Sequence, residues 1–135
     1  MKLSSMSFFS LASQRMEWLS ARQKVIAENV ANADTPGFKA RDVSSFQEML
    51  SSTAVSSGVA VTTAGHISSS GPESAAPGVR VETDGSAWAA SIDGNSVVLE
   101  QQTIRANEVS ESYRLASSLY RKGYELLTLS VTGIR

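Results

Sequence analysis

The residues whose types could most readily take part in catalysis are charged side chains in the C-terminal third of the chain. Four glutamates alternate there with four basic residues, namely Glu100, Glu108, Glu111, Glu125, Arg105, Arg114, Arg121 and Lys122. A carboxylate can act as a general acid or base, but catalysis also requires a concave pocket that holds a substrate. Because these charges recur along one predicted helix, we interpret them as its solvated or subunit-facing side.

Other candidate groups lack the partners that chemistry would require. His66 is the only histidine and the chain has no cysteine, whereas a metal site or a histidine-based catalytic arrangement needs further ligands or partners. Asp84-Gly85 and Asp93-Gly94-Asn95 look superficially like calcium loops, but they lack the alternating ligands and bidentate glutamate of an EF-hand. We therefore predict turns there, no catalytic, metal or cofactor-binding site, and no enzymatic activity.

The overall charge is nearly balanced. Twelve Lys and Arg residues against 13 Asp and Glu residues give a net charge of −1, so no long-range field attracts nucleic acid or an anionic bilayer. The short apolar run before Gln14 and Arg15 has no small-residue cleavage site. No segment approaches the roughly 20 apolar residues of a membrane-spanning helix. We expect a soluble chain with no cleaved signal peptide, no nucleic-acid partner and no direct membrane insertion.

Apolar periodicity predicts a long helix near each end of the chain. From Phe9 to Ala33, and again from Val97 to Val131, apolar residues recur at alternating spacings of three and four, which is a heptad pattern. Further apolar residues widen both stripes, namely Leu11, Trp18 and Val25 in the first segment and Leu115, Leu119, Leu126 and Leu129 in the second. At 1.5 Å per residue the helices are roughly 35 and 50 Å long. A helix of the greater length needs another long helix beside it to bury its apolar face.

The boundaries of the C-terminal helix and the middle of the chain have their own signals. Asn95 or Ser96 is expected to cap the helix start, and Gly133 to stop it. The segment before it, residues 51–92, is rich in Ser, Ala, Gly and Thr and has too few large apolar residues to offset the entropy of ordering. We predict a mobile or partner-ordered loop. Within it, Val79–Thr83 alternates like a strand, so a small β-hairpin turning at Asp84-Gly85 is compatible with the pattern.

The most specific stretch of the sequence is the expected end of the N-terminal helix. Asn29 and Asn32 share one helix face, where their amides can bond carbonyls that the helix end leaves unpaired. They are followed by Thr35-Pro36-Gly37-Phe38. Pro36 and Gly37 fit the central positions of a type II turn, which gives Phe38 a fixed direction in which to dock. Mechanically, this is a helix end followed by a tight turn.

The same stretch resembles the N-terminal signature of the flagellar axial proteins, the family of rod, hook and related proteins. In that signature an Asn-rich helix end runs into a Thr-Pro-Gly-aromatic turn. The likeness continues through residues 11–16, 19–23 and 93–95, and covers about half of the chain. The length of 135 residues fits the short proximal-rod members of the family. The middle segment matches no family pattern, and residues 129–135 are less typical of it.

The resemblance implies a structural subunit of the bacterial flagellar rod. Such a protein is exported by the flagellar type III apparatus without a cleaved signal and polymerises in the periplasm within the MS ring. The implied partners are other copies of the chain, other flagellar rod proteins, the adaptor protein at the rod base, and MS-ring and export-gate proteins. The polymer would form part of the axial drive shaft and of the export channel that serve motility.

We therefore predict an all-α fold in which two long terminal helices pack as a coiled-coil-like antiparallel pair. Residues 1–50 and 93–135 would form one structural domain, with residues 51–92 as a flexible segment between them. The predicted helix-pair and subunit interface comprises Phe9, Leu11, Met16, Trp18, Leu19, Ile26, Val30, Leu99, Val109, Tyr113, Leu119, Tyr120 and Leu127. Three alternatives stay open: another short axial rod protein, a two-helix adaptor unrelated to flagella, and a small periplasmic hydrolase that uses a glutamate of the long helix.

Overall fold

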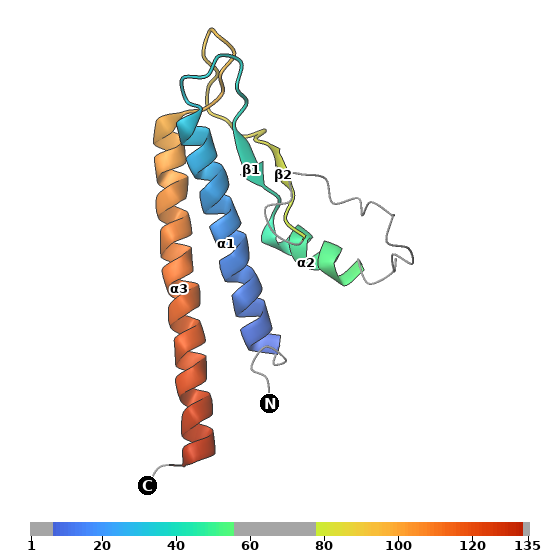
Figure 1. Cartoon of the computed structure of the whole chain (residues 1–135), viewed down its shortest axis with the longest axis vertical. Helices are drawn as coiled ribbons and strands as arrows, with labels where there is room; N and C mark the ends of the chain where they lie inside the picture. The colour runs from blue at the N-terminus through green and yellow to red at the C-terminus, as the bar shows by residue number, and fades with distance from the viewer. Residues whose placement is uncertain (1–6, 56–77, 134–135) are drawn as a thin grey trace, which may run out of the picture.

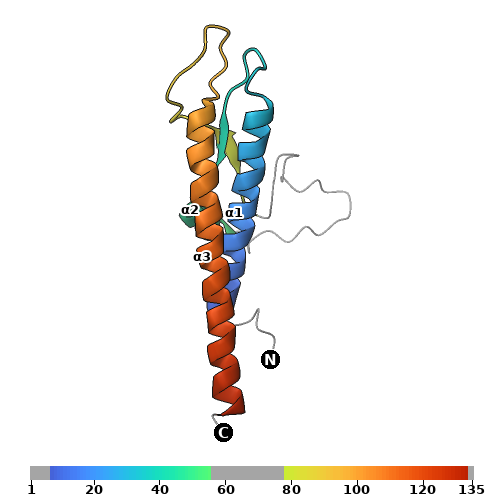
Figure 2. The ribbon, with the colours of Figure 1, turned by 90° about the vertical axis from the view of Figure 1, so that its left-hand side faces the viewer.

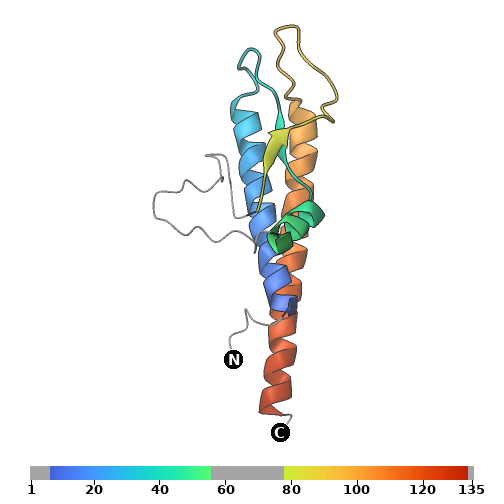
Figure 3. The same ribbon diagram turned by 90° about the vertical axis from the view of Figure 1, so that its right-hand side faces the viewer.

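The computed structural model describes residues 7–55 and 78–133 of the chain. In chain order, the elements are α1 (Ser7–Ala31), β1 (Arg41–Val43), α2 (Phe46–Val55), β2 (Val81–Thr83) and α3 (Leu99–Thr132). Figure 1 shows α1 and α3 side by side and antiparallel, and Figure 3 shows the two strands and α2 lying over one side of this pair. The predicted fold of two long, paired terminal helices is confirmed.

The two long helices differ in length, and α3 extends past α1. With 25 and 34 residues, α1 and α3 span roughly 38 and 51 Å at 1.5 Å per residue. Phe8 in the first turn of α1 lies against Gly123, where an added Cβ would come within 2.7 Å of the Phe8 ring. Residues 124–132 of α3 therefore continue beyond the described start of α1, as Figures 1 and 2 show. This projecting end is about 13 Å long.

The ends of α3 agree only partly with the prediction. Gly133 stops the helix as expected, with a φ of 67° and its N–H donating to the Leu129 carbonyl at 3.1 Å. The start is different, because the residue before the helix is Val98, which offers no side-chain cap. The prediction that Asn95 or Ser96 caps α3 was wrong. The polar groups of both residues are used in contacts with the chain that follows α1.

The small sheet also differs from the predicted hairpin. The strand predicted within Val79–Thr83 is present as β2, but its antiparallel partner is β1, with Arg41 opposite Thr83 and Val43 opposite Val81. The pairing joins the segment after α1 to the segment before α3. The two paired strands are therefore not connected by a turn at Asp84-Gly85. A hairpin contained within the middle segment is therefore corrected to a sheet that spans the two halves of the chain.

An unpredicted helix, α2, follows β1. Its first turn is closed by a reciprocal capping box, since the Glu48 N–H donates to the Ser45 hydroxyl at 3.3 Å and the Ser45 N–H donates to the Glu48 carboxylate at 3.0 Å. The helix crosses the expected domain boundary after residue 50, and the division into domains stays a prediction. The part of the predicted loop at residues 56–77, which includes His66, lies outside the described residues.

The hydrophobic core sits where α1, α2, the strands and the first third of α3 meet. Its buried residues are Trp18, Leu19, Ala21, Ile26, Met49, Val79 and Val109. The indole Nε1 of Trp18 donates to the Ser44 carbonyl at 2.8 Å, so the largest core side chain is also satisfied as a donor. In α3, the buried residues are confined to Gln101, Gln102, Arg105 and Val109. The helix beyond Val109 is only partly covered by its own chain.

Candidate assembly interface

The Thr-Pro-Gly motif forms the predicted turn and docks on the loop before α3. The Phe38 N–H donates to the Thr35 carbonyl at 3.2 Å, and Gly37 has a φ of 72°, as a type II turn requires. The Gly37 N–H then donates to the Asp93 carbonyl at 3.0 Å. On the other side of the turn, the Phe38 carbonyl accepts a hydrogen bond from the Ser96 N–H at 3.0 Å. The turn therefore fixes the end of α1 against the start of α3.

Asn95 is the central residue of this junction. Its side chain is 3% exposed, and its Nδ2 donates to the carbonyls of Asn32, Ala33 and Thr35 at 3.0, 2.8 and 2.8 Å. Its Oδ1 accepts a hydrogen bond from the Val97 N–H at 2.7 Å. The residue thus joins the backbone of the turn that follows α1 to the loop before α3, and its side chain is used there rather than as a cap of α3.

The two asparagines of α1 have different roles. Asn32 acts as predicted, since its Nδ2 donates to the Glu28 carbonyl at 2.8 Å. Asn29 is fully buried and pairs with the backbone of β1: its Nδ2 donates to the Arg41 carbonyl at 2.7 Å, and its Oδ1 accepts from the Arg41 N–H at 2.9 Å. The Asn29 amide also donates to Gln102 on α3 at 3.1 Å. Asn29 therefore links three elements rather than closing its own helix.

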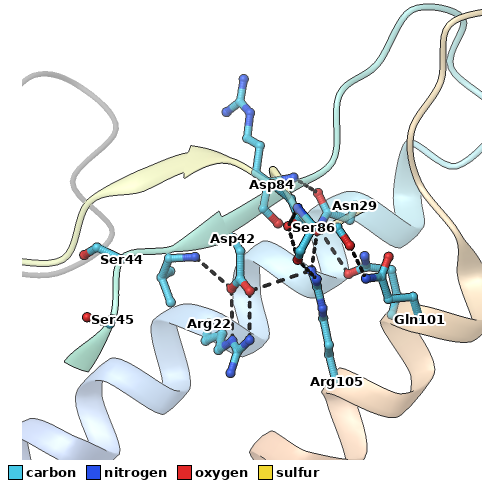
Figure 4. A network of polar contacts seen from close by, with 12 residues as sticks. Arg22, Asn29, Asp42, Ser44, Ser45, Asp84, Ser86, Gln101 and Arg105 are labelled. Atoms are coloured by element: carbon cyan, nitrogen blue, oxygen red, sulfur yellow. Dashed lines mark hydrogen bonds and ion pairs between the residues drawn. The ribbon is translucent and has the colours of Figure 1, made fainter. Parts of the chain in front are cut away.

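An ion network, drawn in Figure 4, holds the strands on the helix pair. Arg22 of α1 binds Asp42 of β1 with both ends of its guanidinium, at 2.9 and 2.8 Å. Arg105 of α3 binds Asp84 at 2.6 Å and lies 3.7 Å from Asp42. Since bidentate, partly buried pairs have a fixed geometry, the network orients β1 and the loop after β2 relative to both helices.

Two pKa values reflect this arrangement. Burial of the Asp84 carboxyl opposes its ionisation, but hydrogen bonds from Arg105 and Ser86 outweigh burial, so the pKa of Asp84 is lowered. The hydrogen bond to Asp42 has the largest effect on Arg22, and the pKa of Arg22 is raised although burial acts in the opposite direction. Both shifts favour the charged forms, which is the condition under which the network binds the strands.

The structure divides the predicted interface residues into two groups. Those that pack inside the chain are buried or partly buried, namely Phe9, Met16, Trp18, Leu19, Ile26, Val109, Tyr120 and Leu127. The rings of Phe9 and Tyr120 meet edge to face with centroids 5.1 Å apart, which pairs the first turns of α1 with the distal half of α3. The remaining residues are exposed, namely Leu11, Val30, Leu99, Tyr113 and Leu119.

Other exposed apolar side chains were missed by sequence analysis. Trp88 is 64% exposed and Ile92 is fully exposed, both in the loop between β2 and α3. The readable signal was two large apolar residues in a stretch of small and polar ones. Ile104 and Tyr124, which are also about half exposed, lie on α3 at 48% and 50%. Together with the predicted residues they make an incompletely covered apolar surface.

The described residues give little support to other kinds of site. Among residues 7–55 and 78–133, no cluster of three His, Cys, Asp or Glu side chains is placed to hold a metal ion. Within the same ranges, no helix combines the length and apolarity needed to span a bilayer. The four glutamates of α3 named above are all exposed on its surface, which is consistent with a solvated or subunit-facing side.

Comparison with known proteins finds flagellar rod proteins. The family model described as flagella basal body rod protein matches residues 10–39. The flagellar basal body rod protein FlgB of Agrobacterium fabrum (strain C58 / ATCC 33970) is 36% identical over 123 residues, which cover 91% of each chain. FlgB of Proteus mirabilis (strain HI4320) is 46% identical over 35 residues, or 26% of each chain. The similarity to the Agrobacterium protein thus extends well beyond the Thr-Pro-Gly motif.

Proposed function

The chain belongs to the flagellar basal-body rod protein family, and we propose that it works there as a structural subunit that polymerises through its paired helices α1 and α3. Membership makes it a component of the basal-body rod, which serves motility, and a protein that assembles with other basal-body components. Membership also argues against the hypothesis of a two-helix adaptor that is unrelated to flagella. Because the proteins of this family are structural, membership gives no support to the hypothesis of a small periplasmic hydrolase.

The observation that carries the proposal is the exposed row of leucines beyond the core. Leu115, Leu119, Leu126 and Leu129 are 61%, 51%, 56% and 48% exposed. Fully burying a leucine side chain stabilises by about 1.5–3 kcal/mol, so covering the exposed half of each contributes about 1 kcal/mol. The four together therefore favour association by about 4 kcal/mol before its entropic cost.

This row lies on a different face of α3 from the residues that pack on α1. Ile104 and the four leucines recur at spacings compatible with one helical face, and Val109, Tyr120 and Leu127 form the face toward α1. A neighbouring subunit can therefore pack against α3 without separating the helix pair. Repetition of this contact around an axis gives a tube of paired helices, which is the expected form of a drive shaft with an export channel.

The remaining parts of the proposal rest on family membership. The subunit is exported by the flagellar type III apparatus with its N-terminal segment intact, and is placed in the periplasm within the MS ring. There it meets other copies, other rod proteins, and the adaptor and export-gate proteins at the rod base. Intact mass measurement of the chain from purified basal bodies tests the export step, because a loss of N-terminal residues would contradict uncleaved export.

The test of polymerisation compares substitutions at two exposed positions of α3. Leu119→Asp places a charge in the exposed leucine row, whereas Ser110→Asp places the same charge on an exposed position nine residues earlier, which is about 180° away around the helix and outside the row. Since both positions are exposed, neither variant should change the circular dichroism of the purified chain. In a strain lacking the native gene, Ser110→Asp should restore rods and swimming, and Leu119→Asp should not. Normal rods with Leu119→Asp would overturn the proposal.

A further inference from the structure

A depression lies between the middle of α1 and the first half of α3. It has a volume of about 240 Å³, and its wall includes the apolar side chains of Trp18, Leu19 and Val109 together with two guanidinium groups, those of Arg15 and Arg22. One water molecule occupies about 30 Å³ in the liquid. The depression is therefore large enough to admit the end of a side chain from another protein.

Arg15 is held over two aromatic rings at the edge of the core. Its guanidinium carbon lies 4.6 Å from the centroid of the Trp18 ring and 4.8 Å from the centroid of the ring of Phe46, the first residue of α2. The two rings meet edge to face with centroids 6.0 Å apart. Cation–π contacts attract a guanidinium and restrict its position. The charge of Arg15 is therefore presented at a defined place in the depression.

Arg15 differs from the two arginines of the ion network. Arg22 is bound by Asp42, and Arg105 is bound by Asp84, as Figure 4 shows. For the Arg15 side chain, neither an ion pair nor a hydrogen bond is found among residues 7–55 and 78–133. An arginine side chain has five N–H donors. Those of Arg15 can therefore bind a group that enters the depression.

The surroundings of Arg15 disfavour its charged form. Partial burial of the guanidinium lowers its pKa, and the positive charge of Arg22 acts in the same direction. An anion in the depression would oppose both effects, because an opposite charge nearby favours the charged guanidinium. Glu108 also lines the depression, but in the part of the chain that the structure describes no ion pair joins it to either arginine. The charge of Arg15 is thus not neutralised by a contact within the described chain.

A carboxylate is the anion that best fits these groups. Its two oxygens accept two parallel N–H bonds from one guanidinium. The hydroxyl of Ser112, which lines the α3 side of the depression, can also donate to an anion. In an assembly of proteins, the carboxylates are those of aspartate and glutamate side chains. The methylene groups of such a side chain would contact the apolar wall.

We propose that the depression between α1 and α3 is a binding site for a carboxylate, and that an acidic side chain of a neighbouring protein in the rod fills it by pairing with Arg15. This inference rests on the proposed function. It differs from the contact of the leucine row because it depends on a charged pair rather than on apolar burial. A charged pair favours one partner and one orientation, since a guanidinium or carboxylate left unpaired at an interface is unfavourable. The site thereby contributes to the choice of neighbour.

Zero-length cross-linking identifies the carboxylate directly. Arg15→Lys places an amine in the depression and keeps the positive charge, and a carbodiimide joins an amine to a carboxylate only where the two are in contact. The variant is expressed in a strain lacking the native gene, and basal bodies purified from swimming cells are treated with the carbodiimide. Mass spectrometry should find an amide between position 15 and an aspartate or glutamate of a second polypeptide chain. The purified subunit, treated in the same way, should not form this amide.

Three outcomes of this experiment would overturn the inference. They are basal bodies with no amide at position 15, an amide to Glu108 of the same chain only, and equal yields of one amide in basal bodies and in the purified subunit. In the first outcome water or a free anion fills the depression, and in the others the chain supplies its own carboxylate. Because swimming cells contain assembled rods, each outcome removes the carboxylate site and leaves the proposed function intact. Failure of the proposed function is seen separately, as normal rods with Leu119→Asp.

Charge removal gives a second test that does not depend on cross-linking. Arg15→Met keeps a long side chain over the Trp18 and Phe46 rings but has neither the charge nor the N–H donors. We expect the urea midpoint of the purified chain to change little, and the complemented strain to lose most of its swimming. The matched control Lys24→Met removes the same charge from an exposed position of α1 and should leave both properties unchanged. Normal swimming with Arg15→Met would overturn the inference, because Arg15 would then only cover the core.

Discussion

The junction at Asn95 gives the sharpest test of how the two ends of the chain are held together. Replacing Asn95 with aspartate keeps the shape of the side chain but puts an oxygen where Nδ2 donates to three backbone carbonyls at 2.8–3.0 Å. Replacing it with alanine removes the bonds without adding a repulsive atom. We therefore expect the isosteric change to be the more damaging of the two.

The magnitude follows from the contacts. Nδ2 has two hydrogens and Oδ1 accepts a further bond from the Val97 N–H, so at about 1 kcal/mol net for each neutral hydrogen bond Asn95→Ala should cost about 3 kcal/mol of unfolding free energy. Asn95→Asp adds a carboxylate at a position that is 3% exposed and faces carbonyl oxygens. The aspartate keeps an acceptor for the Val97 N–H but loses both donated bonds, about 2 kcal/mol, and the buried charge that faces oxygens costs about 2–3 kcal/mol more, giving about 4–5 kcal/mol in total.

Urea unfolding of the full-length chain, followed by circular dichroism, measures both losses. At acid pH the protonated carboxyl of the Asn95→Asp variant regains one O–H donor, so the difference between the variants should shrink as the pH falls toward about 4. Comparing the variants with each other at each pH cancels the titration of other groups. Equal midpoints for Asn95→Asp and Asn95→Ala at neutral pH would refute the reasoning.

Three further predictions concern the network, the turn and the core. The lowered pKa of Asp84 means that its ionised form stabilises the fold above the ordinary aspartate pKa of about 3.9, and that this contribution is lost as the pH falls through the lower folded-state value. The unfolding free energy should therefore fall less on acidification in Asp84→Asn than in the native chain, as urea unfolding at several pH values will show, and parallel acid losses would contradict this. Gly37→Ala should lower the unfolding free energy by about 1–2 kcal/mol because the φ of 72° at this position is unfavourable for a residue with a Cβ, and Gly37→Asn should lower it less. Thermal melting of the two variants ranks these losses. Equal losses would exclude backbone strain as their cause. Leu19→Asp, at 2% exposure, should abolish cooperative unfolding of the purified chain, whereas Leu119→Asp should not; a native-like melt of the former would contradict the core assignment.

Local patterns in the sequence predicted those parts of the fold that local physics determines. The three-four spacing of apolar residues predicted both long helices, Gly133 marked the end of α3, and Pro36-Gly37 predicted the turn after α1. The capping box of Ser45 and Glu48 was equally local, and α2 was readable from it. The second half of α2, residues 51–55, lies in the serine-rich segment that was predicted to be a loop.

The missed parts depend on contacts between distant segments. Asn95 has a residue type that favours helix caps, but its amide bonds carbonyls some 60 positions earlier, and Asn29 pairs with the backbone of β1 rather than with its own helix end. No local pattern distinguishes these uses from a cap. Similarly, β2 was readable as a strand, but nothing near it in the sequence identified β1 as its partner.

The apolar periodicity also does not distinguish residues that pack in the core from residues that are exposed on the subunit surface. The same heptad register contains Val109, which is buried, and Tyr113, which is 45% exposed, because α2 and the strands complete the core only over the first part of α3. Which members of a stripe are buried within the chain therefore depends on how far along α3 these other elements reach. That limit is a property of the packed structure, where Val109 is the α3 residue that belongs to the buried core cluster.

The central claim is that the leucine row of α3 is open in the single chain and covered in the rod. The most direct measurement is the maleimide reactivity of Leu119→Cys, the sole thiol in a chain without native cysteine, in the purified subunit and in basal bodies from motile cells. The account predicts rapid labelling of the free subunit, strong protection in the intact rod, and full labelling after the rod is dissociated. Equal labelling of free and assembled subunits would contradict it.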